Sequence, residues 1–422
     1  MHKSVLVPSI RLDAVPMQDG KDLDEIVAAI GESRIVLLGE ASHGTSEFYS
    51  VRSAITKRLI EEKGFQLIAV EGDWPSCYEV NRFIKNYSNS PTSARAALGS
   101  FKRWPTWMWA NEEIEELVGW LHTFNQNRTE QAKVGFYGLD VYSLWESMDE
   151  IIRYLKETNS PQLEQALQAF SCFEPYHGDE QHYGAAAVFS LSESCENEVV
   201  ELLRSIRKER LANPGAEEQE LNLEMNALVA VHAEQYYRAM MRGGSESWNI
   251  RDEHMTETID KLLATHGPDA KIIVWEHNTH IGDARATDMA DEGMVNVGQL
   301  VRERYGHEQV YAIGFGTYEG SVIASQKWGG DIEHMPVPPA MKGSWEEAVH
   351  ETGLGDCWIE FRGRKEVYGE SIGHRAIGVI YHPRAERYGN YVPTVMAERY
   401  DGFIFIDRTK ALHPHAIEYT FA

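Results

Sequence analysis

The strongest constraint on the fold is a short apolar run that ends in a glycine-flanked turn and leads into a helical pattern. Residues 34–38 read RIVLL, residues 39–44 read GEASHG, and apolar residues then recur at helical spacing over residues 45–63. A strand, a turn and a helix in this order are typical of the first βα unit of an α/β sheet. Ligands bind beyond the carboxyl ends of the strands in such sheets. We therefore expect Glu40 and His43 to lie where chemistry is done.

Similar apolar runs follow along the chain. They predict strands at residues 65–70, 134–139 and 271–275, and helices at residues 75–87 and around residues 114–121. Shorter candidates complete the pattern: strands at residues 309–313, 357–361, 376–381 and 402–406, a hairpin-like pair at residues 318–324, and a helix at residues 23–30. Together these patterns predict an α/β fold whose core is a mostly parallel sheet flanked by helices.

Strand patterns are missing from residues 145–267. Helical patterns replace them at residues 191–211, 217–241 and 249–264, with turn signals at residues 213–215 and 243–245. We interpret this segment as a large helical insertion that forms a lobe over the cleft. The predicted domains are an α/β core of residues 1–144 and 268–422 and a helical lobe of residues 145–267.

The charge balance excludes some classes of partner. The chain of 422 residues has 40 basic and 65 acidic residues, which gives a net charge of −25. Cationic patches supply much of the affinity for nucleic acid and for anionic membrane surfaces. We therefore expect a small-molecule partner, with no nucleic acid and no membrane. The sequence does not indicate an oligomeric state.

The cysteines and the N-terminal residues bear on the compartment. Cys77, Cys172, Cys195 and Cys357 are widely spaced, which is typical of reduced thiols rather than of a disulfide framework. The apolar stretch at residues 5–7 is too short for a signal sequence, and no later run reaches a membrane-spanning length. These features predict a reduced, cytoplasmic protein.

Ionisable residues follow four of the predicted strands. The four strand ends carry Glu40 and His43, then Glu71 and Asp73, then Asp140, and finally Glu276, His277 and His280. The carboxyl ends of parallel strands meet at one edge of a sheet, so these side chains are expected to converge. Each group alone could be a solvated turn residue, but the joint pattern favours a site.

The residue types suggest roles in acid–base chemistry. An imidazole titrates near neutral pH, so His43 suits a general base that is oriented by Glu40. Arg52 lies on the next helix, where its guanidinium suits a carboxylate such as Glu40 or an anionic intermediate. Arg251, which begins the last helix of the insertion, could reach over the site as part of a lid.

Two interpretations of His277 and His280 stay open. One is a metal site with histidine and glutamate ligands, and the other is metal-free acid–base and oxyanion chemistry. The spacing is not that of a zincin motif, so a divalent metal is compatible with the sequence but not required, and no other cofactor is indicated. Ser42 lacks the first glycine of a nucleophile elbow and is only an alternative nucleophile.

Several sequence blocks resemble a known family. Residues 38–49 (LGEASHGTSEFY), 71–74 (EGDW) and 275–287 (WEHNTHIGDARAT) resemble the signature blocks of the erythromycin esterase family. Residues 103–107 (RWPTW) and 247–252 (SWNIRD) are similar to its intermediate blocks. The blocks occur in order and cover nearly the whole chain.

The resemblance implies an α/β core with a helical lobe, and hydrolysis of a carboxylic ester or lactone by water without an acyl-enzyme. It makes His43 the general base and places the other essential groups at Glu40, Arg52, Glu71, His277 and His280. Glu71 would help to position water or base, and His277 or His280 would stabilise the oxyanion together with Arg52. Substrate-binding roles are expected for Asp73, Trp74, Trp104, Trp107, Asp140, Arg251, Asp283 and Arg285.

The family covers more than one activity. Some members act in antibiotic resistance by opening macrolides, and others carry a succinoglycan-biosynthesis label, so the resemblance does not fix the substrate. Glu276 stands where the macrolide-resistance members have a small residue. Two alternatives remain: a metallohydrolase that uses Glu40, His43, His277 and His280 as ligands, and a non-catalytic binder of a haem-like small molecule.

Overall fold

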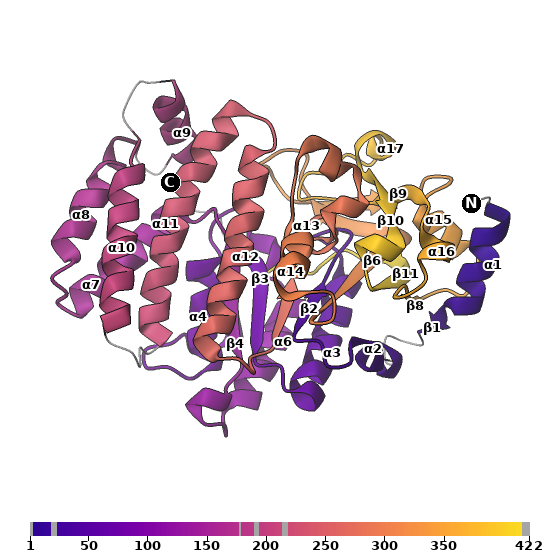
Figure 1. Cartoon of the computed structure of the whole chain (residues 1–422), viewed down its shortest axis with the longest axis horizontal. Helices are drawn as coiled ribbons and strands as arrows, with labels where there is room; N and C mark the ends of the chain where they lie inside the picture. The colour runs from indigo at the N-terminus through magenta and orange to yellow at the C-terminus, as the bar shows by residue number, and fades with distance from the viewer. Residues whose placement is uncertain (1–2, 18–22, 177–178, 190–193, 213–217, 416–422) are drawn as a thin grey trace. The chain divides into compact units, whose positions relative to one another are not determined.

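The computed structural model of the chain describes residues 3–17, 23–176, 179–189, 194–212 and 218–415. These residues form an α/β fold, with helices packed around a sheet (Figure 1). The sheet is mixed and mostly parallel and has nine strands, in the order β1-β8-β11-β6-β2-β5-β3-β4, with β7 paired to β6. The strands are β1 (Val15–Pro16), β2 (Ile35–Leu38), β3 (Leu67–Asp73), β4 (Gly135–Asp140), β5 (Ile272–Trp275), β6 (Val310–Ala324), β7 (Glu333–Val337), β8 (Cys357–Glu360) and β11 (Gly402–Thr409). The predicted fold class is confirmed.

The chain divides into two compact units. Unit 1 comprises Met1–Ala69, Val80–Phe136 and Ala270–Ala422, and unit 2 comprises Val70–Glu79 and Tyr137–Asp269. Strands β3 and β4 each begin in unit 1 and end in unit 2. The predicted domain boundaries stay a prediction.

Unit 1 carries the strand pairing that positions the first candidate site. Strand β2 is parallel to β5 on one side and to β6 on the other, and Leu38 is in register with Trp275 and Ile313. Every residue of β2 and β5 is buried, as expected for inner strands that are covered on both faces. The chain therefore leaves β2 and β5 at the same level of the sheet.

Most helices belong wholly to one unit. Those of unit 1 are α1 (Lys3–Asp13), α2 (Asp24–Ile30), α3 (Ser46–Lys63), α5 (Ala94–Leu98), α6 (Glu112–Asn125), α13 (Asn278–Ile281), α14 (Val297–Tyr305), α15 (Trp345–His350), α16 (Lys365–Tyr368), α17 (Glu386–Gly389) and α18 (Met396–Arg399). Helix α4 (Trp74–Ile84) begins in unit 2 and ends in unit 1. None of the helices in the described part of the chain is long and apolar enough to cross a membrane.

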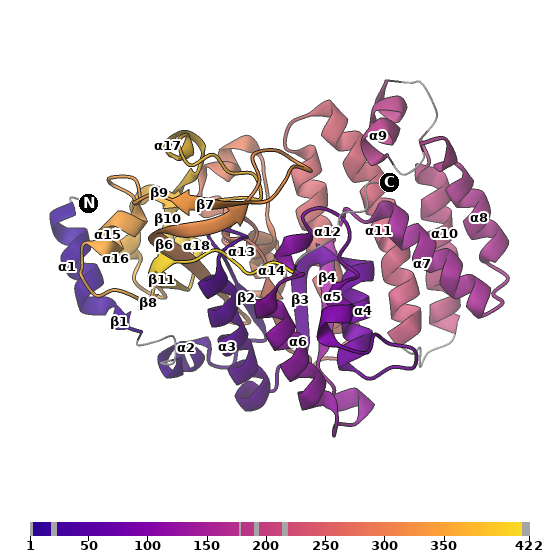
Figure 2. The ribbon, with the colours of Figure 1, turned by 180° about the vertical axis from the view of Figure 1, so that it is seen from behind.

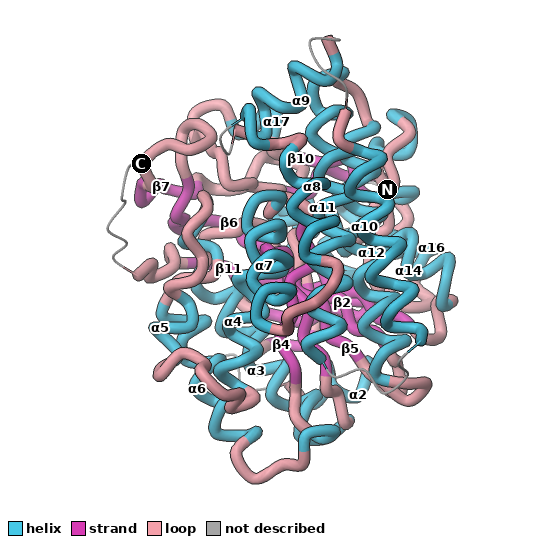
Figure 3. Tube along the Cα trace, turned by 90° about the vertical axis from the view of Figure 1, so that its left-hand side faces the viewer, coloured by secondary structure: helices cyan, strands magenta, loops and turns pink. Residues whose placement is uncertain are grey.

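Unit 2 is mainly a group of neighbouring helices (Figure 3). They are α7 (Leu144–Glu157), α8 (Leu163–Ser171), α9 (Glu180–Val188), α10 (Glu196–Ala212), α11 (Glu218–Arg242) and α12 (Glu246–His266). Helix α11 packs against α7, α9, α10 and α12, which explains why most of its residues are buried. The predicted run of helices in this part of the chain is confirmed, whereas the predicted turn at residues 213–215 lies outside the described residues.

Some sequence expectations were wrong. Residues 376–381 are not a strand, because Ile377 and Ile380 make only isolated bridges to the loop residues Ser42 and Ser325. Residues 318–324 are not a hairpin but the end of the long strand β6, which β7 joins (Figure 2). An antiparallel pair, β9 (Ser371–Arg375) with β10 (Tyr391–Val395), was not predicted.

The expectation of four reduced thiols was also wrong. Cys172 and Cys195 form a disulfide bond in unit 2, although 23 residues separate them in sequence. Cys77 and Cys357 are free and buried. The disulfide removes the argument from reduced cysteines, so the cytoplasmic location stays a prediction.

Candidate functional site

Two glycines hold the loop between β2 and α3 in place. A Cβ atom on Gly39 would lie 2.1 Å from Oδ1 of Asn278, and one on Gly44 would lie 1.9 Å from the backbone oxygen of Ile323. Real side chains do not approach that closely, so only glycine fits at either end of the loop. The amide of Asn278 donates to the backbone oxygen of Glu40 at 2.9 Å. Contacts with the segment after β5 and with β6 therefore hold the loop in place.

Glu40 and His43 are in direct contact within this loop. Nδ1 of His43 lies 2.8 Å from Oε1 of Glu40, and both side chains are buried. The carboxylate can only accept a hydrogen bond, so Nδ1 of His43 carries the proton in the neutral ring. Nε2 is then the basic nitrogen. This is the geometry of a carboxylate that orients a general base.

Arg52 completes the contact from helix α3. Its Nη2 donates to Oε2 of Glu40, so the two carboxylate oxygens serve different partners. The guanidinium is fully buried and lies 4.5 Å from the ring centre of Tyr49 and 4.6 Å from that of Trp275. Aromatic rings whose centres lie within about 6 Å of a buried cation stabilise it. The positive charge of Arg52 is thus fixed beside Glu40.

His277 lies beside His43, with the two ring centres 4.9 Å apart. It is the N-cap of α13, where its Nδ1 accepts a hydrogen bond from the amide of Thr279 at 3.3 Å and contacts the Thr279 hydroxyl at 2.8 Å. Because Nδ1 accepts, the neutral ring carries its proton on Nε2. His43 and His277 therefore have opposite tautomers, one suited to accept a proton and one to donate a hydrogen bond.

Glu276 and His280 are also buried in unit 1. Glu276 follows β5 directly, and its amide donates to the backbone oxygen of Leu38 at 3.3 Å. His280 lies on the single turn of α13, and its amide donates to the backbone oxygen of His277 at 2.9 Å. Both residues belong to the segment that carries His277.

A second cluster of charged residues lies in unit 2. Nη2 of Arg251 donates to Oε1 of Glu71 and to Oδ2 of Asp140, each at 2.7 Å, and Nε donates to Oδ1 of Asp140 at 2.9 Å. Burial opposes the charge of Arg251, but the carboxylates of Asp140 and Glu71 outweigh it and raise the pKa of Arg251. The structure brings these three residues together in unit 2, and it brings Glu40, His43, Arg52 and His277 together in unit 1. A joint site of all seven stays a prediction.

Tyr142 and Cys77 complete the surroundings of the second cluster. Arg251 lies 4.9 Å from the ring centre of Tyr142, and burial raises the pKa of that phenol well above its usual value. Burial also raises the pKa of the Cys77 thiol, and the carboxylates of Asp73 and Asp140 raise it further. Cys77 is therefore a protonated core residue rather than a nucleophile.

The three predicted aromatic contacts differ in exposure. Trp107 is fully buried, and Trp74 is buried in unit 2 with its indole nitrogen 2.8 Å from Oδ1 of Asn222. Trp104 is half-buried, and its ring centre lies 4.7 Å from that of Trp328, a half-exposed residue. Of the three, Trp104 is the one that a ligand could reach without repacking the core.

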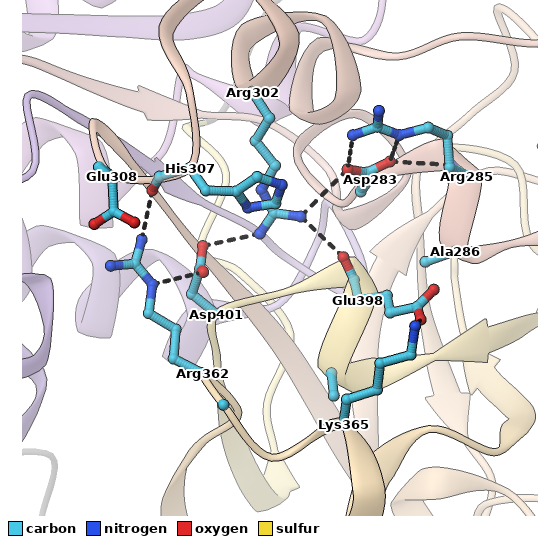
Figure 4. Close-up of a pocket in the computed structure, with 12 residues that line it drawn as sticks. Asp283, Arg285, Ala286, Arg302, His307, Glu308, Arg362, Lys365, Glu398 and Asp401 are labelled. Atoms are coloured by element: carbon cyan, nitrogen blue, oxygen red, sulfur yellow. Dashed lines mark hydrogen bonds and ion pairs between the residues drawn. The ribbon is translucent and has the colours of Figure 1, made fainter.

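Asp283 and Arg285 line a different cavity of unit 1 (Figure 4). Its volume is about 640 Å³, and His307 and Asp401, which also line it, lie shortly before the amino ends of β6 and β11. Glu40 and His277 instead follow the carboxyl ends of β2 and β5. The lining charges pair with one another: Arg285 and Arg302 with Asp283, Arg302 and Arg362 with Asp401, and Lys365 with Glu398. Asp283 and Arg285 therefore do not lie with the predicted base.

The cluster around Glu40 does not fit a metal site. Among the described residues no group of three histidine, cysteine or acidic side chains could hold a metal ion. Glu40 already accepts from His43 and Arg52, and the guanidinium would repel a divalent cation at the same carboxylate. The donor set thus gives no support to the metallohydrolase alternative.

Sequence reasoning overlooked Asn278. Its side chain contacts Gly39 and both polar backbone atoms of Phe315, and its amide reaches Glu40. The signal was present, because Asn278 stands inside the block WEHNTH between two of the candidate histidines.

Comparison with known proteins decides the family. The family model named Erythromycin esterase matches residues 60–409. The chain belongs to the erythromycin esterase family. This membership confirms the resemblance seen in the sequence blocks.

The proteins that the chain resembles are distant from it in sequence. "Putative hydrolase YbfO" of Bacillus subtilis (strain 168) is 23% identical over 409 residues, which cover 92% of this chain and 86% of that protein. Erythromycin esterase type II of Escherichia coli is 22% identical over 387 residues, which cover 82% of this chain and 85% of that protein. The crystal structure of a succinoglycan biosynthesis protein has a TM-score of 0.81 at 20% identity and covers 98% of this chain and 99% of that one. The last match shows a shared fold.

Proposed function

We propose that the protein is a hydrolase that cleaves a carboxylic ester or lactone of a small molecule, with water activated by His43. Family membership supports the reaction class. The observation that carries the proposal is the 2.8 Å contact between Nδ1 of His43 and Oε1 of Glu40, which leaves Nε2 as the base. An imidazole oriented in this way accepts a proton near neutral pH and returns it later in the reaction.

The proposed reaction has two steps. Nε2 of His43 takes a proton from water as the oxygen attacks the carbonyl carbon, and a tetrahedral oxyanion forms. The oxyanion then collapses, the carbon–oxygen bond to the alcohol breaks, and the imidazolium gives its proton to the leaving oxygen. The products are an acid and an alcohol, joined in one molecule when the substrate is a lactone. Glu40 stabilises the imidazolium between the two steps.

The oxyanion needs hydrogen-bond donors or positive charge. The neutral His277 ring carries its proton on Nε2, and Arg52 supplies a permanent buried charge. Donors that are already in place before the reaction are worth several kcal/mol, on the order of 10²–10³ in rate. We assign this role to His277 and Arg52, with His280 as a neighbouring contributor. The proposal takes the role of Glu71 in orienting water or base from the resemblance alone.

The test compares two neighbouring residues. His43→Ala should abolish hydrolysis, whereas Ser42→Ala should keep it, because the hydroxyl of Ser42 is buried and hydrogen-bonded to Thr45. Both variants and the wild type would be screened against macrolides, simple lactones and aryl esters. Mass spectrometry of the quenched enzyme should find no acylated protein. A His43→Ala variant with full activity, or an acyl adduct that disappears in Ser42→Ala, would reject the proposal.

A further inference from the structure

A second buried polar chain in unit 1 begins at Asn278, the residue after His277. Nδ2 of Asn278 donates to the backbone oxygen of Phe315 at 2.7 Å and lies 3.2 Å from Nε2 of His374. Oδ1 accepts from the amide of Phe315 at 3.2 Å. Asn278 and His374 are both fully buried, so each of these contacts is made away from water.

His374 continues the chain to a carboxylate. Its Nδ1 lies 2.6 Å from Oε1 of Glu346, which also accepts from the amide of Arg375 at 2.9 Å. Glu346 is fully buried on α15, and His374 lies on β9. Neither residue belongs to the blocks that carry the family resemblance, and neither contacts His43 or Arg52 directly.

The partners fix the protonation of His374. The amide NH₂ of Asn278 can only donate, so Nε2 of His374 accepts, and Nδ1 carries the proton that it donates to Glu346. Burial lowers the pKa of His374, against the carboxylate of Glu346, while Arg399 and Arg375 lower it further. Burial raises the pKa of Glu346, but His374 and Arg375 outweigh it and leave that pKa lowered. A neutral imidazole and an ionised carboxylate therefore stand side by side.

We propose that Glu346 and His374 are positioning residues that hold the His277 imidazole in place through Asn278. The inference rests on the proposed function, in which His277 donates to the oxyanion. Asn278 is the first residue of α13, and His277 is the N-cap of that helix. A shift of the Asn278 side chain therefore moves His277. The same shift also moves Glu40, because the backbone N–H of Asn278 donates to the backbone oxygen of Glu40, and the side-chain Oδ1 of Asn278 packs against Gly39.

The hydrogen-bonded series from Glu346 through His374 to Asn278 specifies one geometry, because each hydrogen bond can form with only one placement of its proton. If His374 took the other tautomer, an N–H would face the NH₂ group of Asn278, and the contact at 3.2 Å would become repulsive. The ionised Glu346 prevents this, since it needs the proton on Nδ1. Glu346 therefore fixes the tautomer of His374, and His374 fixes the orientation of the Asn278 side-chain amide, more than sixty residues before Glu346 in sequence.

The experiment removes and restores the acceptor at position 374. His374→Ala deletes it, His374→Gln replaces Nε2 with an amide oxygen of similar reach, and Glu346→Gln keeps the shape but removes the charge. We expect His374→Ala to lower kcat about 10- to 100-fold with KM within about twofold, because small misplacements of catalytic groups have effects of this size. His374→Gln should recover most of the loss, and Glu346→Gln should fall between the two.

A matched control exists in the same unit. Nδ1 of His350 lies 2.6 Å from Oδ1 of Asp407, the same distance as between His374 and Glu346. The His350 side chain is 39% exposed, its ring stacks on Tyr318, and no hydrogen bond links it to Asn278. His350→Ala should therefore leave kcat unchanged. If His350→Ala lowers kcat as much as His374→Ala does, the effect is a general loss of stability, and the positioning role is rejected.

A second readout does not depend on activity. Nitrogen-15 spectra of histidine-labelled protein report the tautomer of each ring, and wild type should show His277 protonated on Nε2 and His374 on Nδ1. In folded His374→Ala, or in Glu346→Gln if the alanine variant does not fold, the His277 signals should shift or broaden. Unchanged His277 signals and unchanged kcat would overturn the inference. If no ester is hydrolysed by wild type, the proposed function fails while these spectra still decide the positioning role.

Discussion

Each unit holds a buried arginine bound to carboxylates, but the two clusters differ in what they can do. In unit 1, Arg52 binds a single carboxylate, Glu40, whose other oxygen accepts from His43. In unit 2, Arg251 bridges two carboxylates, Glu71 and Asp140, through three hydrogen bonds. The first cluster contains an imidazole, the side-chain type best suited to general acid–base chemistry. The second cluster contains no imidazole.

This difference leads us to expect separate roles for the two clusters. The three groups of unit 1 sum to zero charge and become positive when His43 takes a proton, which suits a step that creates an oxyanion. The three groups of unit 2 are one arginine and two carboxylates, and none of them is an imidazole. We therefore expect the unit 1 cluster to supply the acid–base chemistry, and Arg251 to stabilise unit 2.

Among the variants that compare the two clusters, Glu40→Gln should have the largest effect. An amide at this position can donate to Nδ1 of His43 and so favours the tautomer with its proton on Nε2, which cannot act as the base. The loss of orientation and charge should lower kcat/KM by about 10³-fold or more, as carboxylate-to-amide changes beside a catalytic histidine do. Steady-state hydrolysis of the best ester found in the substrate screen measures it.

Glu47→Gln is the control for that change. Glu47 lies on the same helix as Arg52, and its Oε2 accepts from the amide of Lys410 at 2.7 Å, outside the cluster. It should keep activity close to wild type. A folded Glu40→Gln protein that hydrolyses the ester at the wild-type rate would show that the carboxylate does not orient the base, and the contrast between the clusters would lose its basis.

Much of the sheet could be predicted because its inner strands have a simple signature. Strands β2, β3 and β5 are buried along their whole length; β2 and β5 are unbroken apolar runs, and β3 begins with one, LIAV. Strands β7 and β10 are five residues long and only partly buried, and neither contains an unbroken apolar run, so they were missed. The Cys172–Cys195 pairing was missed because it depends on how α8 and the segment before α10 pack, which spacing does not reveal.

The candidate site divides in the same way. Glu40 and His43 are three residues apart, so the sequence alone could predict their contact. The contact between Arg52 and Glu40 follows from the direction of one helix. The link from Glu346 through His374 to Asn278 joins distant segments by side-chain contacts alone, and a single sequence has no pattern that reports such contacts.

The second prediction is about the stability of unit 2. Arg251→Met leaves Glu71 and Asp140 buried without their cation, and loss of one partner from a buried ion pair costs about 3–5 kcal/mol. The free energy of unfolding, from urea denaturation followed by circular dichroism, should fall by that amount. Arg285→Met removes an arginine that is 47% exposed and bonded to Asp283, so it should cost only about 0–1 kcal/mol. Equal losses in the two variants would contradict the view that Arg251 holds unit 2 together.

The smallest expected effect is a dependence of the free energy of unfolding on pH, which is measured apart from the rate of hydrolysis. His254 lies in unit 2 with its Nδ1 2.8 Å from Nδ1 of His232. Burial lowers the pKa of His254 well below its usual value, and His232 lowers it further against a hydrogen bond to the Asp140 backbone. The unfolded state therefore binds a proton that the folded state does not, and stability is lost as the pH falls below about 6.5.

Measurement of the unfolding free energy between pH 7.5 and pH 5 tests this expectation. His254, whose pKa lies well below its usual value in the folded protein, should cost about 1–2 kcal/mol by pH 5, since one pKa unit corresponds to about 1.36 kcal/mol. His254→Asn should reduce the slope, but not to zero, because burial also lowers the pKa of His374 in unit 1. His182→Asn, a change at an exposed residue of α9, should keep the wild-type slope. If His254→Asn also keeps that slope, acid destabilises the protein through other groups, and His254 has no part in it.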